Sequence, residues 1–287
     1  MDFLDEAETG ILCGDGAMGT LLLDAGFALD DCLEALCLSD PAQIRRVHDR
    51  YIAAGARVIE TNTFGANAVR LARFGLEHQV AEINRAGAAI ARDAASGERV
   101  YVAGSVGPLG ISATEAANRG IDRAGCFREQ ISSLIDAGVS LIVLETFTSV
   151  EEMEVAFRAK LSLGQTPTVC SFSCGPAGIL HCGTEIGDAI TRIQQIGPAL
   201  FGVNCMNDPA ATLELIRRIP RQDRFAAYPA AGYPQQRDSR YHYPVEPAQF
   251  ASVVPDLIAE GVRLIGGCCG TTPAHIAAVA SAVARCE

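Results

Sequence analysis

Tryptophan is absent from the sequence, lysine occurs once, and no apolar run reaches the roughly 18 residues that a membrane-spanning helix needs. With Lys160 as its one lysine and a formal net charge of −11 at pH 7, the chain lacks the basic stripe that neutralises nucleic-acid phosphates. Its acidic N-terminus does not show the basic and then apolar layout of a secretory signal. We therefore expect a cytoplasmic protein that binds neither nucleic acid nor membrane.

Linkers and low-complexity tracts are also missing from the chain. It has 287 residues, of which 49% are hydrophobic and 20% charged, so it can bury a large core and is not expected to be disordered. That length exceeds an average domain but is common for a single α/β barrel. We expect residues 1–287 to form one domain.

The eleven cysteines contain no C-x-x-C pair, and a disulfide framework is not expected in a cytosolic chain. Cys13 and Cys170 lie within strand-like runs, and Cys286 lies one residue from the end. We expect these three to be buried as small hydrophobic residues. The adjacent pair Cys268 and Cys269 is different, because glycines flank it on both sides.

Short β-rich runs alternate with amphipathic segments along the whole chain. Alternation of this kind predicts parallel strands, and eight such units close into a (β/α)₈ TIM barrel. The alternative, an open doubly wound sheet, usually carries a glycine-rich phosphate motif after its first strand, and none is present. The eight predicted strands are 11–17, 57–63, 100–106, 139–147, 167–174, 200–205, 225–231 and 262–269.

Helix starts between these strands have recognisable caps. A capping side chain directly before proline favours a helix N-terminus, and a Ser-x-x-Glu spacing is typical of a capping box. These signals occur at Asp40-Pro41, Asp208-Pro209, Thr272-Pro273, Ser149 to Glu152 and, as an apolar helical period, in 185–196.

Two connections are long and leave the same end of the predicted barrel. They are residues 18–40 after the first strand and 232–247 after the seventh. The second is rich in proline, tyrosine and polar residues, and we interpret it as an ordered loop or lid.

Chemically capable residues gather where the predicted strands end. In a barrel of this type the site is built at the carboxyl ends of the strands, so these side chains are expected to lie together. They are Asp15 after strand one, 60–63 after strand two, Glu145 and Thr146 after strand four, Asn204 and Cys205 after strand six, and Cys268 and Cys269 after strand eight.

Three of these residues predict a metal site. Cys268 and Cys269 cannot easily bond to each other, and flanking glycines allow both thiols to point at one spot, where Cys205 can supply a third. Three sulfurs without a nearby histidine favour zinc, and three ligands with an open fourth position are typical of a catalytic site. The alternative is that all three are buried small residues.

Six motifs in a fixed order resemble the homocysteine S-methyltransferase family over nearly the whole chain. The region 31–87 most resembles the homocysteine-binding module of cobalamin-dependent methionine synthase and the methyltransferase half of fusions with methylenetetrahydrofolate reductase. Neither a cobalamin module nor a reductase is recognised here, so we expect the thiol-activating module alone. The motifs are GDGAMGT (14–20), ETNTFGAN (60–67), GSVGP (104–108), LETF (144–147), GVNC (202–205) and GGCCGTTPAHI (266–276).

The resemblance implies roles for these positions. Cys205, Cys268 and Cys269 correspond to the family's zinc ligands. Asp15 and Glu145 match carboxylates that hold the homocysteine amino group. Backbone N–H groups near Met18 and Gly19 correspond to those that hold the substrate carboxylate, and Glu60 matches a position that contacts substrate or supports the loop. We interpret Asn204 as orienting Cys205 or its loop, and His275 as capping or packing rather than as a ligand.

Two departures from the family pattern concern the fourth metal position and the donor. Some members close the zinc shell with an asparagine in a P-N-A-G motif, where this chain has Ala230. Betaine-using members place a tyrosine where Gly65 follows Phe64. Water or a hydroxyl is then expected at the fourth position, the candidates being Tyr228, Tyr233, Tyr241 and Tyr243.

Zinc deprotonates a bound thiol, and a thiolate attacks a methyl carbon directly. Only 6% of residues are aromatic, which disfavours a cage for betaine and leaves S-methylmethionine or methylcobalamin on a separate corrinoid protein as donors. The alternatives are a non-catalytic zinc-binding barrel and a methyltransferase for another small thiol. A metallohydrolase is disfavoured, because the five histidines lie away from the strand ends.

Overall fold

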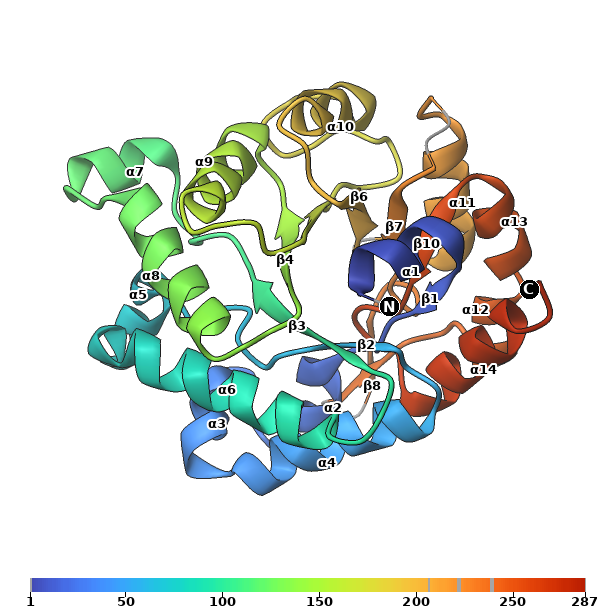
Figure 1. The fold of residues 1–287 in the computed structure, drawn as a ribbon, viewed down its shortest axis with the longest axis horizontal. Coiled ribbons are helices and arrows are strands. Elements are labelled where there is room, and N and C mark those ends of the chain that lie inside the picture. Colours follow the sequence, from blue (N-terminus) through green and yellow to red (C-terminus); the bar gives the residue numbers. More distant parts are fainter. Residues whose placement is uncertain (1, 206, 221–222, 238–239, 287) are drawn as a thin grey trace.

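Eight parallel strands form the central sheet of the computed structural model, which describes residues 2–205, 207–220, 223–237 and 240–286. Their order is β1-β10-β7-β6-β5-β4-β3-β2, and a parallel bridge between Gly14 and Val58 joins the two ends into a ring (Figure 1). Every strand lies within its predicted range, so the (β/α)₈ barrel is confirmed. The strands are β1 Leu12–Cys13, β2 Val58–Glu60, β3 Tyr101–Val106, β4 Leu141–Phe147, β5 Thr168–Phe172, β6 Leu200–Asn204, β7 Phe225–Tyr228 and β10 Val262–Ile265.

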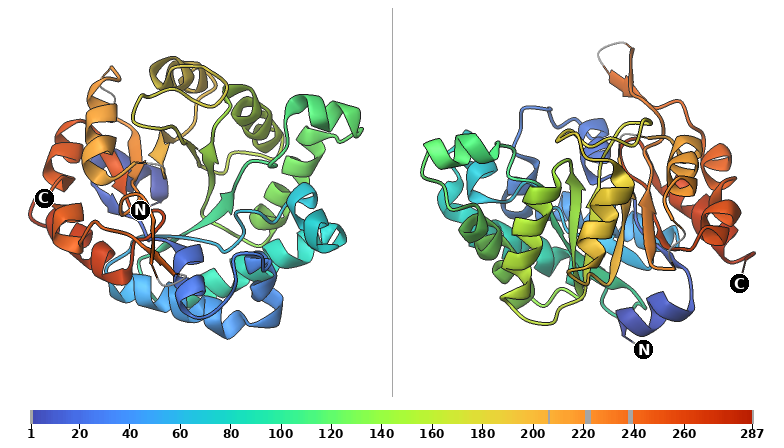
Figure 2. Two further views of the ribbon diagram at one scale, coloured as in Figure 1. Left: turned by 180° about the vertical axis from the view of Figure 1, so that it is seen from behind. Right: turned by 90° about the horizontal axis from the view of Figure 1, so that it is seen from above.

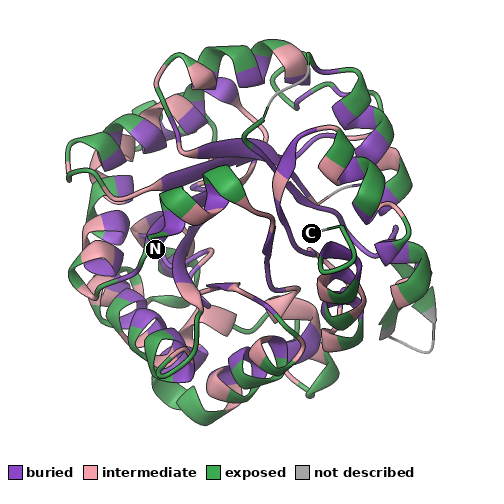
Figure 3. Cartoon of the chain, turned by 45° about the vertical axis from the view of Figure 1, so that its right-hand side comes forward, coloured by how far each residue is buried: buried purple, intermediate pink, exposed green. Residues whose placement is uncertain are grey.

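Helices surround the strands and turn their exposed faces outward, while the strands themselves are almost entirely buried (Figure 3). The α-helices are α1 Phe3–Thr9, α2 Met18–Asp24, α3 Leu36–Ser39, α4 Pro41–Ala53, α5 Ala68–Leu71, α6 Val80–Ala94, α7 Ala113–Asn118, α8 Arg123–Asp136, α9 Val150–Leu161, α10 Ile186–Gln194, α11 Pro209–Arg217, α12 Pro247–Ala251, α13 Val254–Ala259 and α14 Pro273–Val283. Short 3₁₀ helices are η1 Leu33–Ala35, η2 Ala72–Phe74 and η3 Glu77–Gln79. Within the described ranges, no helix is long and apolar enough to cross a membrane.

The predicted helix caps are confirmed with one change. Ser149 accepts a hydrogen bond from the Glu152 N–H at 3.4 Å, but the Glu152 carboxylate accepts from the Leu109 N–H at 2.9 Å instead of returning to the cap. The reciprocal half of that capping box is therefore absent. The other caps are Asp40 on α4, Asp208 on α11, and Thr272 with His275 on α14.

One end of the barrel is closed by α1. Phe3 packs edge-on against Tyr101 with ring centroids 5.6 Å apart, and both residues join the core inside the barrel. Figure 2 shows α1 and the long loop after β7 at opposite ends of the barrel. A functional cavity is therefore confined to the other end. The inner core takes Leu12, Val58, Ala103, Leu141, Val143, Val169, Leu200, Ala226, Tyr228 and Leu264 from the eight strands.

The two long connections are ordered in different ways. The first contains α2, η1 and α3, and the second contains an antiparallel hairpin of β8 Gln235–Arg237 and β9 Arg240–His242. The sequence did not predict the hairpin, because polar residues on both strands hide the alternation that a half-buried strand shows.

The expectation for the three isolated cysteines is partly wrong. Cys13 and Cys170 are buried, but Cys286 is exposed. The last helix ends at Val283, and Cys286 follows it on the surface.

Candidate metal and substrate site

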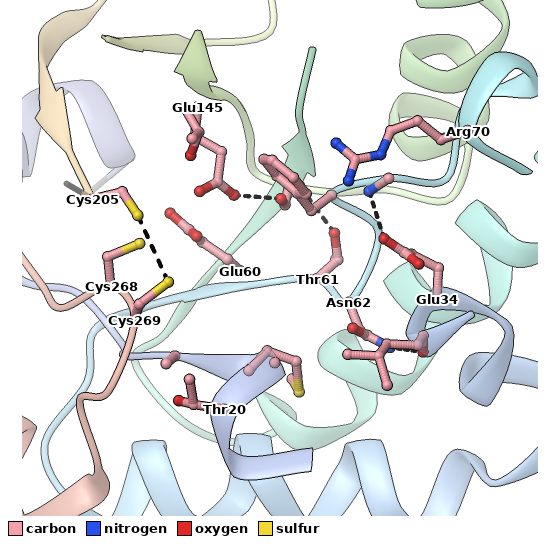
Figure 4. A pocket seen from close by; sticks show the side chains of 18 of the residues that line it. Thr20, Glu34, Glu60, Thr61, Asn62, Arg70, Glu145, Cys205, Cys268 and Cys269 are labelled. Atoms are coloured by element: carbon pink, nitrogen blue, oxygen red, sulfur yellow. Dashed lines mark hydrogen bonds between the residues drawn. The ribbon is translucent and has the colours of Figure 1, made fainter. Parts of the chain in front are cut away.

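A cavity of about 530 Å³ opens at the carboxyl ends of the strands (Figure 4). It brings together the nine residues that the sequence assigned to metal or substrate, although these come from five different strand ends and are up to 254 positions apart. The nine predicted residues that line it are Asp15, Met18, Gly19, Glu60, Glu145, Asn204, Cys205, Cys268 and Cys269.

The three thiols converge on one point. Cys205 follows β6, and Cys268 and Cys269 follow β10, two places round the ring. Their Sγ atoms all lie within 4.8 Å of one another, and those of Cys205 and Cys269 are 3.6 Å apart. Sulfurs about 2.3 Å from a tetrahedral zinc would be separated by about 3.8 Å, so the donor set fits that ion in number, chemistry and spacing.

Crowding raises the proton affinity of the thiols. The pKa of Cys268 lies well above its usual range because of hydrogen bonds with the thiols of Cys205 and Cys269, followed by burial. The pKa of Cys269 is raised to about 12, with the Cys205 thiol as the largest cause. Without a cation Cys268 and Cys269 favour their protonated forms, whereas a bound divalent ion would displace those protons.

Backbone geometry directs the thiols into the cavity. Cys205 has a left-handed backbone with φ 58°, and its N–H donates to the Tyr228 carbonyl at 2.9 Å. The Cys268 N–H donates to the Pro229 carbonyl at 2.8 Å. Both cysteine loops are therefore hydrogen-bonded to adjacent residues at the end of β7. These two bonds set the distance between the loops.

Asn204 connects the β6 end to the β4 end. Its Oδ1 accepts from the Thr146 N–H at 2.9 Å and from the Ser171 hydroxyl at 3.0 Å, while its Nδ2 donates to Thr146 Oγ1 at 2.7 Å and to Glu145 Oε2 at 3.4 Å. Thr146, with φ 62°, is the second left-handed non-glycine residue of the described chain. A β-branched residue in this conformation needs support from its surroundings.

Three carboxyl groups cluster beside the thiols, Asp15 buried and Glu60 and Glu145 partly buried. Asp15 Oδ2 accepts from the Glu60 N–H at 2.9 Å, the Glu60 and Glu145 side chains hydrogen-bond to each other, and the Ser105 hydroxyl donates to Glu145. Burial is the largest cause that raises the pKa of all three, and repulsion from Glu145 adds to it for Asp15 and Glu60. An ammonium group placed among them would relieve this repulsion.

Met18 and Gly19 lie in the first turn of α2, where backbone N–H groups have no partner within the helix. The Ala17 N–H before them donates to Thr271 Oγ1 at 3.0 Å. Gly267, whose Cβ would meet the Thr271 side chain at 2.6 Å, allows this close approach of the two loops.

The four candidate tyrosines differ in position. Tyr228 is buried in the cavity wall, and its hydroxyl has no hydrogen-bond partner among the residues that the structure describes. Tyr243 is partly buried over Gly270, outside that lining. Tyr233 and Tyr241 are 53% and 44% exposed.

Sequence reasoning missed part of the wall. Ser105 and Phe64 lie within motifs that were recognised, so a signal existed for them. Glu34, Arg70 and Arg73 lie outside the motifs, on short helices that no pattern assigned to the site.

A family model described as homocysteine S-methyltransferase matches residues 12–283. Methionine synthases from Mycobacterium leprae and Mycobacterium tuberculosis are 33% and 34% identical over 100% and 99% of this chain, which spans about a quarter (25%) of their length. The metallated form of the Escherichia coli homocysteine methyltransferase MmuM superposes with a TM-score of 0.79 and 27% identity, covering 95% of this chain and 96% of that one.

Proposed function

The chain belongs to the homocysteine S-methyltransferase family, and we propose that it methylates the sulfur of homocysteine at a zinc ion held by Cys205, Cys268 and Cys269. One observation carries this proposal. Three thiols within 4.8 Å of one another face a cavity whose neighbouring wall holds the carboxyl groups of Asp15, Glu60 and Glu145. The three thiols suit a soft metal and a thiol ligand, and the carboxyl groups suit the ammonium end of an amino acid.

The chain's residues bind and orient the amino acid. Asp15 and Glu145 receive the ammonium group, and N–H groups of Met18 and Gly19 at the start of α2 receive the carboxylate. Glu60 supports Asp15 and Glu145 through its backbone N–H and its side chain, which places it beside the ammonium group. With both ends of the amino acid held, the side-chain sulfur reaches the three cysteines.

When bound, zinc would stabilise the homocysteine sulfur as a thiolate at neutral pH, although the free thiol has a pKa of about 8.5. The thiol proton leaves to solvent. A new bond forms between the homocysteine sulfur and the methyl carbon, and the bond from that carbon to the donor breaks with its electron pair on the donor. Positioning by Asp15 and Glu145 is of the kind that lowers a barrier by several kcal/mol.

Two methyl donors remain under consideration. S-methylmethionine is a small sulfonium that fits a self-sufficient enzyme and leaves as methionine, a neutral thioether. Methylcobalamin on a separate corrinoid protein is the second candidate, because the chain is similar to one quarter of two methionine synthases.

The test is a panel of methyl donors with homocysteine, with methionine formation as the readout. It is run with and without a corrinoid protein, and wild type is compared with Cys268→Ser. We expect the wild type to form methionine and the Cys268→Ser variant to form none. Zinc retained without any thiol binding would support a non-catalytic zinc-binding barrel, and turnover of another small thiol in place of homocysteine would reassign the substrate.

A further inference from the structure

The cavity has a second charged end that homocysteine does not use. Figure 4 shows Cys205, Cys268 and Cys269 on one side and Arg70 with Glu34 on the opposite side. A volume of about 530 Å³ lies in the range of pockets for drug-sized ligands, which exceed a four-carbon amino acid. The far end therefore has room for a second molecule in the same cavity.

Arg70 stacks on an aromatic ring at this end. Its guanidinium carbon lies 4.9 Å from the centroid of the Phe64 ring, and its backbone N–H donates to Asn67 Oδ1 at 3.0 Å. Phe64 lies against Gly107, where any Cβ would collide with the ring. Stacking on an aromatic face orders the guanidinium plane before a ligand arrives.

The donors of the Arg70 side chain are unused. Within the described residues the guanidinium makes no hydrogen bond and no ion pair, and its one recorded interaction is the cation–π contact with the Phe64 ring. Glu34 lies close by, but its Oε1 accepts from the Gly65 N–H at 2.8 Å rather than from Arg70. A Cβ at Gly65 would come within 3.0 Å of Arg70 Nε, so glycine leaves the space that both side chains occupy.

The remaining charge of the cavity wall is mostly negative. A cationic methyl donor is therefore favoured in the cavity as a whole, while an anionic group finds its partner at the arginine end. A planar guanidinium binds a carboxylate through two parallel hydrogen bonds. The charged lining residues are Asp15, Asp30, Asp31, Glu34, Glu60 and Glu145 against Arg70 and Arg73.

We propose that Arg70, stacked on Phe64 beside Glu34, binds a carboxylate of the methyl donor, so that the donor is a small molecule that carries a carboxylate as well as the methyl group that it transfers. This assignment rests on the proposed methyl transfer to homocysteine. It selects against small cations that lack a carboxylate.

The experiment compares three sulfonium compounds that differ in their charged groups. S-methylmethionine carries a carboxylate and an ammonium group, 3-dimethylsulfoniopropionate carries a carboxylate alone, and trimethylsulfonium carries neither. Each is titrated calorimetrically into the zinc-loaded full chain without homocysteine, and each is then used for methyl transfer. The proteins are wild type, Arg70→Met, Arg70→Lys and, as a charge-matched control on the exposed face of α6, Arg85→Met.

Loss of a charge-assisted hydrogen-bonded pair is expected to raise Kd and KM of Arg70→Met about tenfold to a hundredfold for the two carboxylate compounds. Trimethylsulfonium and homocysteine should stay within about twofold, and Arg70→Lys should recover part of the loss. Wild type that binds neither carboxylate compound, or an Arg70→Met variant that weakens all three equally, would overturn the assignment. If the donors bind as expected but no methionine forms, the assignment of Arg70 stands and the proposed function is contradicted.

Discussion

The ring of Tyr243 fills the space that a side chain on Gly270 would need. Gly270 follows Cys269 directly and has φ 80°, a left-handed conformation. Tyr243 comes from the loop after β7, which is tied to α14 by a hydrogen bond between the Val245 carbonyl and His275 at 2.8 Å. The long loop and the cysteine loop therefore hold each other in place.

Gly270→Ala should destabilise the chain more than a matched change elsewhere. Gly75 has φ 71° with nothing near its missing Cβ, so Gly75→Ala bears only the left-handed penalty of about 1–2 kcal/mol. Gly270→Ala adds the collision with Tyr243, about 1–3 kcal/mol, and should also weaken zinc binding. Urea unfolding and competition with a chromogenic chelator measure the two effects. Equal losses from the two substitutions would show that the Tyr243 contact has no consequence.

Asn204→Ala should weaken zinc binding although Asn204 is not a ligand. The change leaves the left-handed Thr146 without the acceptor for its N–H and frees the residue that directly precedes Cys205, so zinc affinity should fall about tenfold. Ser171→Ala removes one hydrogen bond to the same amide, and should lower stability by about 1 kcal/mol without changing zinc affinity. If chelator competition gives the same zinc affinity for the wild type and both variants, Asn204 does not orient the metal ligands.

Glu145→Gln should affect the substrate and not the metal. The amide keeps the shape and the contact with Ser105 but cannot carry the charge that faces an ammonium group. Homocysteine KM should rise about tenfold to a hundredfold. 4-Mercaptobutyrate, which has the thiol and carboxylate but no ammonium group, should bind wild type and variant alike. Lower zinc content in the variant, or equal weakening of both thiols, would contradict this assignment.

His48 should make the fold sensitive to acid. It is fully buried on α4, both ring nitrogens lack hydrogen-bond partners within the described part of the chain, and burial lowers its pKa from 6.5 to about 4. Below pH 6.5 the unfolded chain binds a proton that the folded chain does not, so stability falls as pH drops from 6.5 towards 4, by about 3 kcal/mol in total. His48→Leu should lose this part of the pH slope, as measured by urea unfolding at pH 7.5 and pH 5. An unchanged difference between the two pH values would contradict the prediction.

The barrel and the metal group could be predicted because each depends on a local signal. Every strand is a β-rich run, and the carboxyl ends of parallel strands must meet, which brings Cys205 to Cys268 without knowledge of the loops. Contacts between loops carry no such signal. Arg70 stacks on Phe64 because Gly107 leaves room for the ring, and α1 closes the barrel because Phe3 meets Tyr101. These pairings follow from packing in three dimensions and were not visible in the order of residues.

X-ray absorption of the zinc-loaded chain, with and without homocysteine, tests the central claim most directly. The account predicts one zinc per chain with three sulfurs at about 2.3 Å and one lighter atom, changing to four sulfurs when homocysteine is added. Cys268→Ser should lose most of the zinc under the same conditions. A chain that binds no zinc after reduction, or a metal shell that homocysteine leaves unchanged, would contradict it.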